Sequence, residues 1–404
     1  MIDGKKLSTI FNNDINNILC ASSGKDITAK EYQHAVECLL KAKPGVLAQN
    51  VGMPDPVIYR TKVATTWDKY HTEVTKAIWP DVLEEQARVQ SDAVRKLFDL
   101  GTDPLALTID ACRKHSVYIV ASYRMNAEDF YHGELDLFDF GRAHKNWAIP
   151  KANCLDPAIP EVYQHRMDIF KEVANNYDID GIEFDFMRWW NMVSDPLKNH
   201  HVLTNMVRDT REVLDKAAKQ KGRKKMLLGV RVRPSLTETL TGSYPNPSCK
   251  DAGLDVRTWI EKGYVNYVCP SFFWPHWPGL PNTAEFVELA ENTNVGIYPT
   301  VFPIPAWLGE EGPIEVDDTE KLMRYKNEFC EVALKSYDDG GDGISTYNWT
   351  PHHQPGMVKN PGREAWGLGA KKVQMYIHTI LGDKKMLLKY GSSDLNVETR
   401  FAGE

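Results

Sequence analysis

Residues 177–190 read YDIDGIEFDFMRWW and place two carboxylates inside an otherwise apolar run. The run is short and rich in isoleucine and phenylalanine, which is the pattern of a buried strand. Side chains alternate between the two faces of a strand, so Glu183 and Asp185 share one face and Phe184 lies on the other. A buried ionisable group without a partner is costly or shifts its pKa. The two acids therefore require a polar environment on their side of the strand.

The rest of the chain alternates between strand-like and helical segments. Strand-like runs lie at residues 8–14, 45–52, 117–124, 180–186, 225–233, 265–273, 295–303 and 342–349. Amphipathic helical patterns lie between them at residues 28–42, 160–177, 202–220, 254–263, 283–293 and 317–340. This order is typical of a parallel sheet with crossover helices, and eight strands predict a (β/α)8 TIM barrel. A doubly wound open sheet is the alternative, but no glycine-rich phosphate turn follows the first strand.

Two insertions and a C-terminal extension complete the expected layout. Residues 54–100 and 126–155 have little strand character and follow the second and third strands. Both insertions fall at the carboxyl ends of strands, where barrels build their active sites. Residues 370–404 are expected to form a closing helix and a polar tail, and residues 1–404 a single barrel domain.

Bulk composition excludes several classes of protein. The 404 residues carry a net charge of −7, which argues against a general nucleic-acid binder. No run of about 18 apolar residues predicts a membrane span, and the N-terminus lacks a basic-then-apolar signal pattern. We therefore expect a cytoplasmic protein, or a secreted one whose signal is absent from this sequence. The sequence sets no oligomeric state, and a dimer is compatible with it.

The cysteines predict buried free thiols rather than a metal site. All 7 are scattered and none forms a CxxC pair. No HxH or HExxH spacing is present either, so we expect no metal and no cofactor. A metal-dependent hydrolase using Asp14, His132, Glu183 and Asp185 remains a minor alternative.

In a barrel, the inward face of each strand leads to the active site. Glu183 and Asp185 are expected to line it, with Asp185 near the strand end and Glu183 one layer deeper. Two neighbouring carboxylates move each other's pKa values apart, which keeps an acid and a base at neutral pH. The structural alternative is an ion pair in which Arg188 or Arg231 neutralises one of the acids.

The segment Asp180–Asp185 also resembles a family motif. Its DG-x-[DE]-x-D core is similar to the chitinase-type signature, although Met187 stands where that family carries its catalytic glutamate. The fuller string is more similar to uncharacterised glycoside-hydrolase-like (β/α)8 barrels. In several barrel glycosidases the acid that ends this strand is a nucleophile or base, so the resemblance implies that role for Asp185.

Other strand ends supply polar and aromatic candidates. The ends of the first, third, fifth and eighth strands carry Asn12, Asn13, Asp14; Arg124, Asn126, Glu128, His132; Arg231, Arg233; and Tyr347, Asn348, Trp349, His352, His353. Two inward arginines on the fifth strand suggest an anionic group to bind. Aromatic candidates for sugar stacking, or for loop packing, are Trp189, Trp190, Trp274, Trp277, Trp307 and Trp349.

These patterns predict a glycoside hydrolase acting on a glycan that bears a carboxylate or sulfate. The expected catalytic residues are Asp185, Glu183, Asp14 and His132. The expected substrate-binding residues are Arg124, Arg188, Arg231, Arg233, Asn348, Trp189, Trp274 and Trp349. Because the sixth and seventh strands end without an acid, the proton donor must be Glu183, Asp14, a loop acid such as Glu128, or a histidine.

Two other functions fit the same pattern. Some inverting barrel sialidases resemble this arrangement, which would assign catalysis to Asp14 after the first strand and His132 after the third, beside Arg124. A non-catalytic carbohydrate-binding barrel would use the aromatic residues equally well.

Overall fold

The computed structural model describes residues 7–14, 16–19, 22–69, 81–126, 138–150, 152, 154–187, 192–240, 246–272, 280–301, 307, 311–312, 314–315, 317–347 and 367–391. Its strands are β1 Thr9–Asn13, β2 Val46–Gly52, β3 Tyr118–Arg124, β4 Gly181–Asp185, β5 Leu227–Val232, β6 Tyr267–Pro270, β7 Gly296–Ile297, β8 Thr300–Val301 and β9 Ile344–Tyr347. Each lies inside one of the eight predicted runs.

The strands form one parallel sheet that closes on itself. Their order is β7-β6-β5-β4-β3-β2-β1-β9-β8, so β7 and β8 stand at its two edges. Only Tyr298 and Pro299 separate these two strands. Tyr298 N donates to Val268 O (2.9 Å) on β6, and Ser345 N on β9 donates to Pro299 O (3.0 Å). The predicted seventh strand is therefore split, and its two halves join the edges of the sheet into an eight-position barrel.

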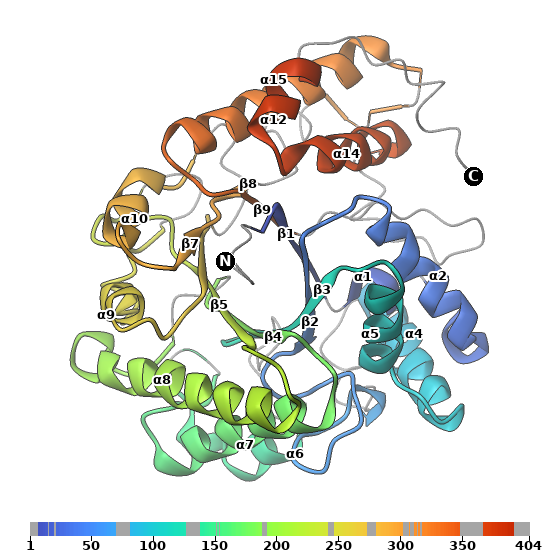
Figure 1. Ribbon diagram of the computed structural model, residues 1–404. Helices are drawn as coiled ribbons and strands as arrows, with labels where there is room; N and C mark the ends of the chain where they lie inside the picture. Colours follow the sequence, from blue (N-terminus) through green and yellow to red (C-terminus); the bar gives the residue numbers. More distant parts are fainter. Residues whose placement is uncertain are drawn as a thin grey trace.

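Helices surround this ring of strands (Figure 1). They are α1 Asn16–Leu19, α2 Ala29–Leu40, α4 Asp81–Asp99, α5 Pro104–Lys114, α6 Asp139–Ala143, α7 Pro160–Asn176, α8 Pro196–Gln220, α9 Val256–Glu261, α10 Thr283–Ala290, α12 Thr319–Asp338, α14 Gly367–Leu381 and α15 Lys384–Tyr390. The predicted TIM-barrel class is confirmed. Within the described part of the chain, no helix has both the length and the apolar character needed to cross a membrane.

Local sequence explains where several helices begin. Thr28 caps α2 by accepting a hydrogen bond from Glu31 N (3.1 Å). Asp318 caps α12 in the same way, through Lys321 N (3.1 Å). Proline occupies the first turn of α7 and α8, where its missing N–H has no helical partner to lose.

The insertion expected at residues 54–100 contains more regular structure than the sequence predicted. It includes α4, and the chain then enters α5, which the sequence patterns did not predict. Asp103 caps α5 through Ala106 N (2.8 Å). Most of its residues are buried, including Thr108 and Cys112. Its polar face is narrow: among its residues only Asp110 and Lys114, four apart, are exposed.

Burial divides each strand into two faces. Alternate residues such as Phe184 pack outward against the helices, where Phe170 of α7 lies 4.7 Å away between ring centroids. The other face fills the lumen. Ile10, Val46 and Val120 lie in an apolar lumen cluster towards the amino ends of the strands. Beyond that cluster, at the carboxyl ends, the lumen is polar.

Candidate active site

The polar layer of the lumen is built from residues two apart on neighbouring strands. Its described members are Asn12, Asp14, Asn50, Ser122, Arg124, Glu183, Asp185, Arg231, Arg233, Ser271 and Tyr347. All are buried, and they come from seven of the eight barrel positions. Glu183 and Asp185 share the inward face, as the alternation of β4 predicts.

Asp185 lies between two arginines. Its Oδ2 atom is 3.0 Å from Arg231 Nη1 and 3.9 Å from Arg124 Nε. Its Oδ1 atom accepts a hydrogen bond from Met187 N (2.9 Å). Asp185 is therefore part of an ion pair at the carboxyl end of β4.

The guanidinium of Arg231 contacts several side chains inside the barrel. Besides Asp185, its Nε and Nη2 atoms donate to Ser271 Oγ at 3.2 and 2.9 Å. Its guanidinium carbon lies 3.6 Å from the centroid of the Tyr347 ring, a cation–π contact. The ion pair that the sequence left open for Arg231 is formed with Asp185. Because Nε, Nη1 and Nη2 all donate to these neighbours, few N–H groups remain to bind a substrate anion.

Asp14 and Arg124 form a second buried ion pair beside the first. Arg124 Nη2 lies 3.0 Å from Asp14 Oδ1 and also donates to the Tyr347 hydroxyl. Burial disfavours the charge on Arg124, but Asp14, Tyr347 and Asp185 outweigh it and raise the pKa of the guanidinium. Acids and arginines thus alternate around the mouth of the lumen.

Glu183 lies one layer below Asp185 and is enclosed by donors. Asn12 Nδ2 (2.7 Å) and Ser122 Oγ (2.9 Å) donate to its Oε1 atom, and the Tyr267 hydroxyl (2.9 Å) donates to Oε2. Burial, reinforced by the charge of Asp185, raises the pKa of Glu183 from 4.5 to about 7. Glu183 therefore carries a proton over much of the acidic to neutral range.

Tyr267 reaches Glu183 because β5 has no side chain in its way. A Cβ atom on Gly229 would lie only 1.9 Å from Tyr267 Cζ. Any larger residue at this position would displace the tyrosine ring. Gly229 is thus needed for a close approach inside the lumen.

Arg233 adds a further positive charge to this layer. It is fully buried, and burial lowers its pKa to about 10, although Cys249 and Asp185 act in the opposite direction.

The structure brings together the predicted residues Asp14, Arg124, Glu183, Asp185, Arg231 and Arg233. Other predicted residues lie outside the described part of the chain: His132, Glu128, Arg188, Asn348, Trp189, Trp190, Trp274, Trp277, Trp349, His352 and His353. For Trp307, the structure shows the packing alternative. Its indole Nε1 donates to Glu328 Oε2 (2.7 Å), and Arg324 lies 4.3 Å over its ring, so it packs on α12.

Four polar lumen residues were not predicted from the sequence: Asn50, Ser122, Tyr267 and Ser271. The same two-residue alternation that identified Glu183 and Asp185 would have found them on β2, β3 and β6.

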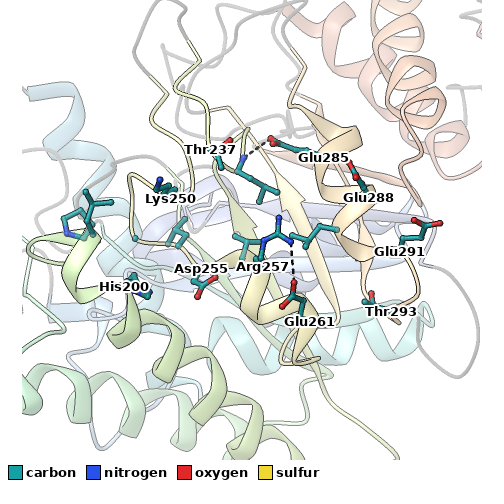
Figure 2. A pocket seen from close by; sticks show the side chains of 17 residues that line it. His200, Thr237, Lys250, Asp255, Arg257, Glu261, Glu285, Glu288, Glu291 and Thr293 are labelled. Carbon is teal, nitrogen blue, oxygen red and sulfur yellow. Dashed lines mark hydrogen bonds and ion pairs between the residues drawn. The ribbon is translucent and has the colours of Figure 1, made fainter.

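One cavity lies outside the barrel. It has a volume of about 920 Å³ and is lined by residues near the start of α8 and along α9 and α10. Figure 2 shows Arg257 paired with Glu261, and Glu285 accepting from the backbone of the loop after β5. None of the polar lumen residues lines this cavity. Among the described residues, no group of three histidine, cysteine or acidic side chains is arranged to hold a metal ion.

Comparison with known proteins supports the fold. No protein-family model matches the chain, and no curated protein matches it. Among solved structures, an endo-β-1,4-mannanase from Thermotoga petrophila matches with a TM-score of 0.50 and 9% identity, over 95% of this chain and 78% of that one. An endo-1,4-β-mannanase from Rhizomucor miehei matches with a TM-score of 0.50 and 9% identity, over 96% of this chain and 97% of that one. At this identity the similarity is one of fold.

Proposed function

We propose that the protein is a glycoside hydrolase whose chemistry takes place at the carboxyl ends of the barrel strands. The observation that carries the proposal is the pair of unlike carboxyl groups on β4. Asp185 is held against Arg231 at 3.0 Å, whereas burial raises the pKa of Glu183 to about 7. An ion-paired acid thus lies beside one whose pKa is raised by burial. The two structurally similar mannanases act on glycosidic bonds, which agrees with this proposal.

In this proposal Asp185 is the base or nucleophile. As a base it takes a proton from the water that attacks the anomeric carbon; as a nucleophile it attacks that carbon itself. Glu183 is enclosed by three donors and lies deeper than Asp185, so we assign it a positioning role. By staying neutral it avoids placing a second negative charge next to Asp185. The leaving oxygen then requires another donor. Asp14 is paired with Arg124 at 3.0 Å, so Glu128 and His132 are the candidates.

We further propose that the glycan carries an anionic group, a carboxylate or a sulfate. The support is the charge of the described lumen. Three arginines, Arg124, Arg231 and Arg233, lie in the described polar layer, where Asp14 and Asp185 pair with the first two. Burial lowers the pKa of Arg233 to about 10, and an anion bound beside it would oppose that shift. The predicted anion-binding role thus rests on Arg233 rather than on Arg231.

A second candidate is an inverting sialidase-like enzyme using Asp14 and His132. The observation in its favour is the Asp14–Arg124 pair at the ends of β1 and β3, 3.0 Å apart. In that arrangement Asp185 would serve only to hold the arginines.

A substrate screen tests both enzyme proposals against a binding-only barrel. Aryl glycosides of neutral, sulfated, uronic and sialic sugars are incubated with wild-type protein and with Asp185→Asn. Release of the aryl group by the wild type alone supports hydrolysis with Asp185 in the chemistry. Saturable binding without cleavage in either protein would support a carbohydrate-binding barrel. Equal cleavage by both proteins would remove Asp185 from the mechanism.

A further inference from the structure

Asn50 is a buried lumen residue to which the catalytic proposal gives no role. On β2 it follows Val46 and Ala48, which belong to the apolar lumen cluster, at the same two-residue spacing. It pairs in register with Ser122 of β3. On its other side, Gln49 of β2 pairs with Asn13 of β1. The next residue on each strand is Asn50 and Asp14, so these two residues lie side by side. Asn50 therefore faces the lumen within the polar layer.

The carboxamide of Asn50 has no hydrogen-bond partner among the described residues. Its side chain is 0% exposed, and neither Oδ1 nor Nδ2 is within hydrogen-bonding geometry of another group. Buried amides in folded proteins are nearly always paired, because an unpaired one lowers stability. The surrounding groups have other partners: Ser122 donates to Glu183 and Arg124 to Asp14. Asn50 is left with both its donor and its acceptor available.

The backbone at this point is also irregular. The register between β2 and β3 passes from Asn50–Ser122 to Gly52–Tyr123, so Val51 is an extra residue on β2. A Cβ atom on Gly52 would lie 2.6 Å from Pro54 O, so the chain turns too tightly there for a larger residue. Bulges of this kind occur next to active sites, where they redirect a side chain.

We propose that Asn50 binds a hydroxyl group of the sugar on which the proposed hydrolase acts. A carboxamide offers an acceptor and a donor side by side, and a hydroxyl can both donate and accept. The nearest charges on the neighbouring strands, Asp14 and Arg124, form an ion pair at 3.0 Å and cancel each other. The β2 side of the lumen is therefore suited to a neutral polar group.

This inference rests on the proposed function, and monodeoxy substrates test it separately. The 4-nitrophenyl glycoside that the wild type cleaves is compared with its monodeoxy analogues, using wild type and Asn50→Leu. We expect Asn50→Leu to lower kcat/KM for the parent glycoside about tenfold or more. We expect no such loss for the one analogue that lacks the hydroxyl bound by Asn50. An equal kcat/KM for both proteins on every analogue would overturn the inference while leaving the proposed hydrolase intact.

Thermal melting supplies a second readout that needs no substrate. Leucine has nearly the shape of asparagine and no unpaired polar atoms, so Asn50→Leu should melt at or above the wild-type temperature. Asn266→Leu is the matched control, because Asn266 Oδ1 accepts from Leu228 N (2.9 Å) and Arg211 Nη1 (3.1 Å), and its loss should lower the melting temperature. A clear drop for Asn50→Leu would mean that buried water satisfies the amide in a structural role. That result overturns the inference even if no glycoside in the screen is cleaved.

Discussion

Arg231 Nη1 lies 3.0 Å from Asp185 Oδ2 inside the barrel, and neither side chain exposes more than 1% of its surface. Removing one partner of such a pair leaves an uncompensated buried charge, which typically costs ~3–5 kcal/mol. Replacing both partners by apolar or neutral groups costs far less. Asp185, the acid proposed for chemistry, therefore also balances a buried charge. Its substitution is expected to lower stability as well as activity.

The first prediction is an energetic coupling between Asp185 and Arg231. Asp185→Asn should lower kcat by at least ~10²–10⁴-fold, as expected for an essential catalytic group. It should also lower the free energy of unfolding by about 3 kcal/mol, because Arg231 then lacks its counter-charge. The double variant Asp185→Asn with Arg231→Met should be more stable than the sum of the two single changes predicts. Urea denaturation of the four proteins measures the coupling.

The catalytic part of this prediction is separated from the structural part by the double variant. Restored stability without restored activity would assign Asp185 to the chemistry. Restored activity would mean that the single variant was inactive only because its fold was disturbed. Additive losses of stability would contradict a close pair in solution.

The second prediction concerns the pH dependence of stability. The pKa of Glu183 is raised in the folded protein from 4.5 to about 7. The folded state therefore binds this proton more tightly than the unfolded state does. The resulting stabilisation is fully present below the unfolded pKa of 4.5 and is lost as the pH rises through about 7. Its full size is up to about 3 kcal/mol, since one pKa unit corresponds to ~1.4 kcal/mol.

Glu183→Gln should remove this dependence. Its free energy of unfolding should fall less steeply than that of the wild type when the pH is raised from about 5 to about 8. Denaturation curves across that range provide the measurement. Glu288→Gln, at an exposed position on α10, is the control and should follow the wild type. Parallel curves for wild type and Glu183→Gln would show that the proton on Glu183 does not contribute.

The third prediction distinguishes the two arginines of β5. Arg233→Ala should raise KM for an anionic glycoside far more than for its neutral analogue, because a lost charge-assisted contact is worth about 2–5 kcal/mol. Arg231→Ala should instead lower stability and impair both substrates, because its guanidinium is bound to Asp185 and Ser271. Steady-state kinetics on a matched charged and neutral pair measures the difference. Equal losses on both substrates for Arg233→Ala would exclude it as the anion site.

What the sequence predicted correctly depends on local patterns. Each strand lies in a run of apolar residues, and the two-residue alternation places Glu183 and Asp185 on one face whatever the rest of the chain does. The pairing of charges was not predictable in the same way. Asp185 and Arg231 are 46 residues apart, and Asp14 and Arg124 are 110 apart. Which acid meets which arginine depends on how the barrel closes, and no local pattern contains that information.

Two features went beyond the local pattern. The sequence left sugar stacking and loop packing open for Trp307, and its indole bonds to Glu328 on α12. The polar face of α5 is narrow, with Asp110 and Lys114 as its exposed residues, and the sequence patterns did not predict this helix. For Trp307 the tertiary environment, rather than the neighbouring residues, determines the role of the side chain.

The fourth prediction compares the two catalytic assignments. If Asp185 performs the chemistry, Asp14→Asn should weaken the pairing with Arg124 and reduce kcat less than Asp185→Asn does. If the sialidase-like arrangement is correct, Asp14→Asn and His132→Ala should both be inactive while Asp185→Asn retains substantial kcat. Turnover of the same substrate by all three variants, each checked for its melting temperature, decides between them.

The last prediction links Tyr267 to the pH profile of activity. The Tyr267 hydroxyl donates to Glu183 Oε2 at 2.9 Å, and this hydrogen bond lowers the pKa that burial has raised. Tyr267→Phe removes the donor, so the pKa of Glu183 should rise above about 7. A hydrogen bond to a charged group is worth ~1.5–3 kcal/mol, which corresponds to about one pKa unit or more.

If neutral Glu183 supports Asp185, the alkaline limb of the pH profile of kcat should move to higher pH in Tyr267→Phe and disappear in Glu183→Gln. Gly229→Ala, which would push the Tyr267 ring aside, should move the limb in the same direction with a larger loss of stability. A limb that stays in place in all three variants would show that another group produces it and that Glu183 has no part in catalysis.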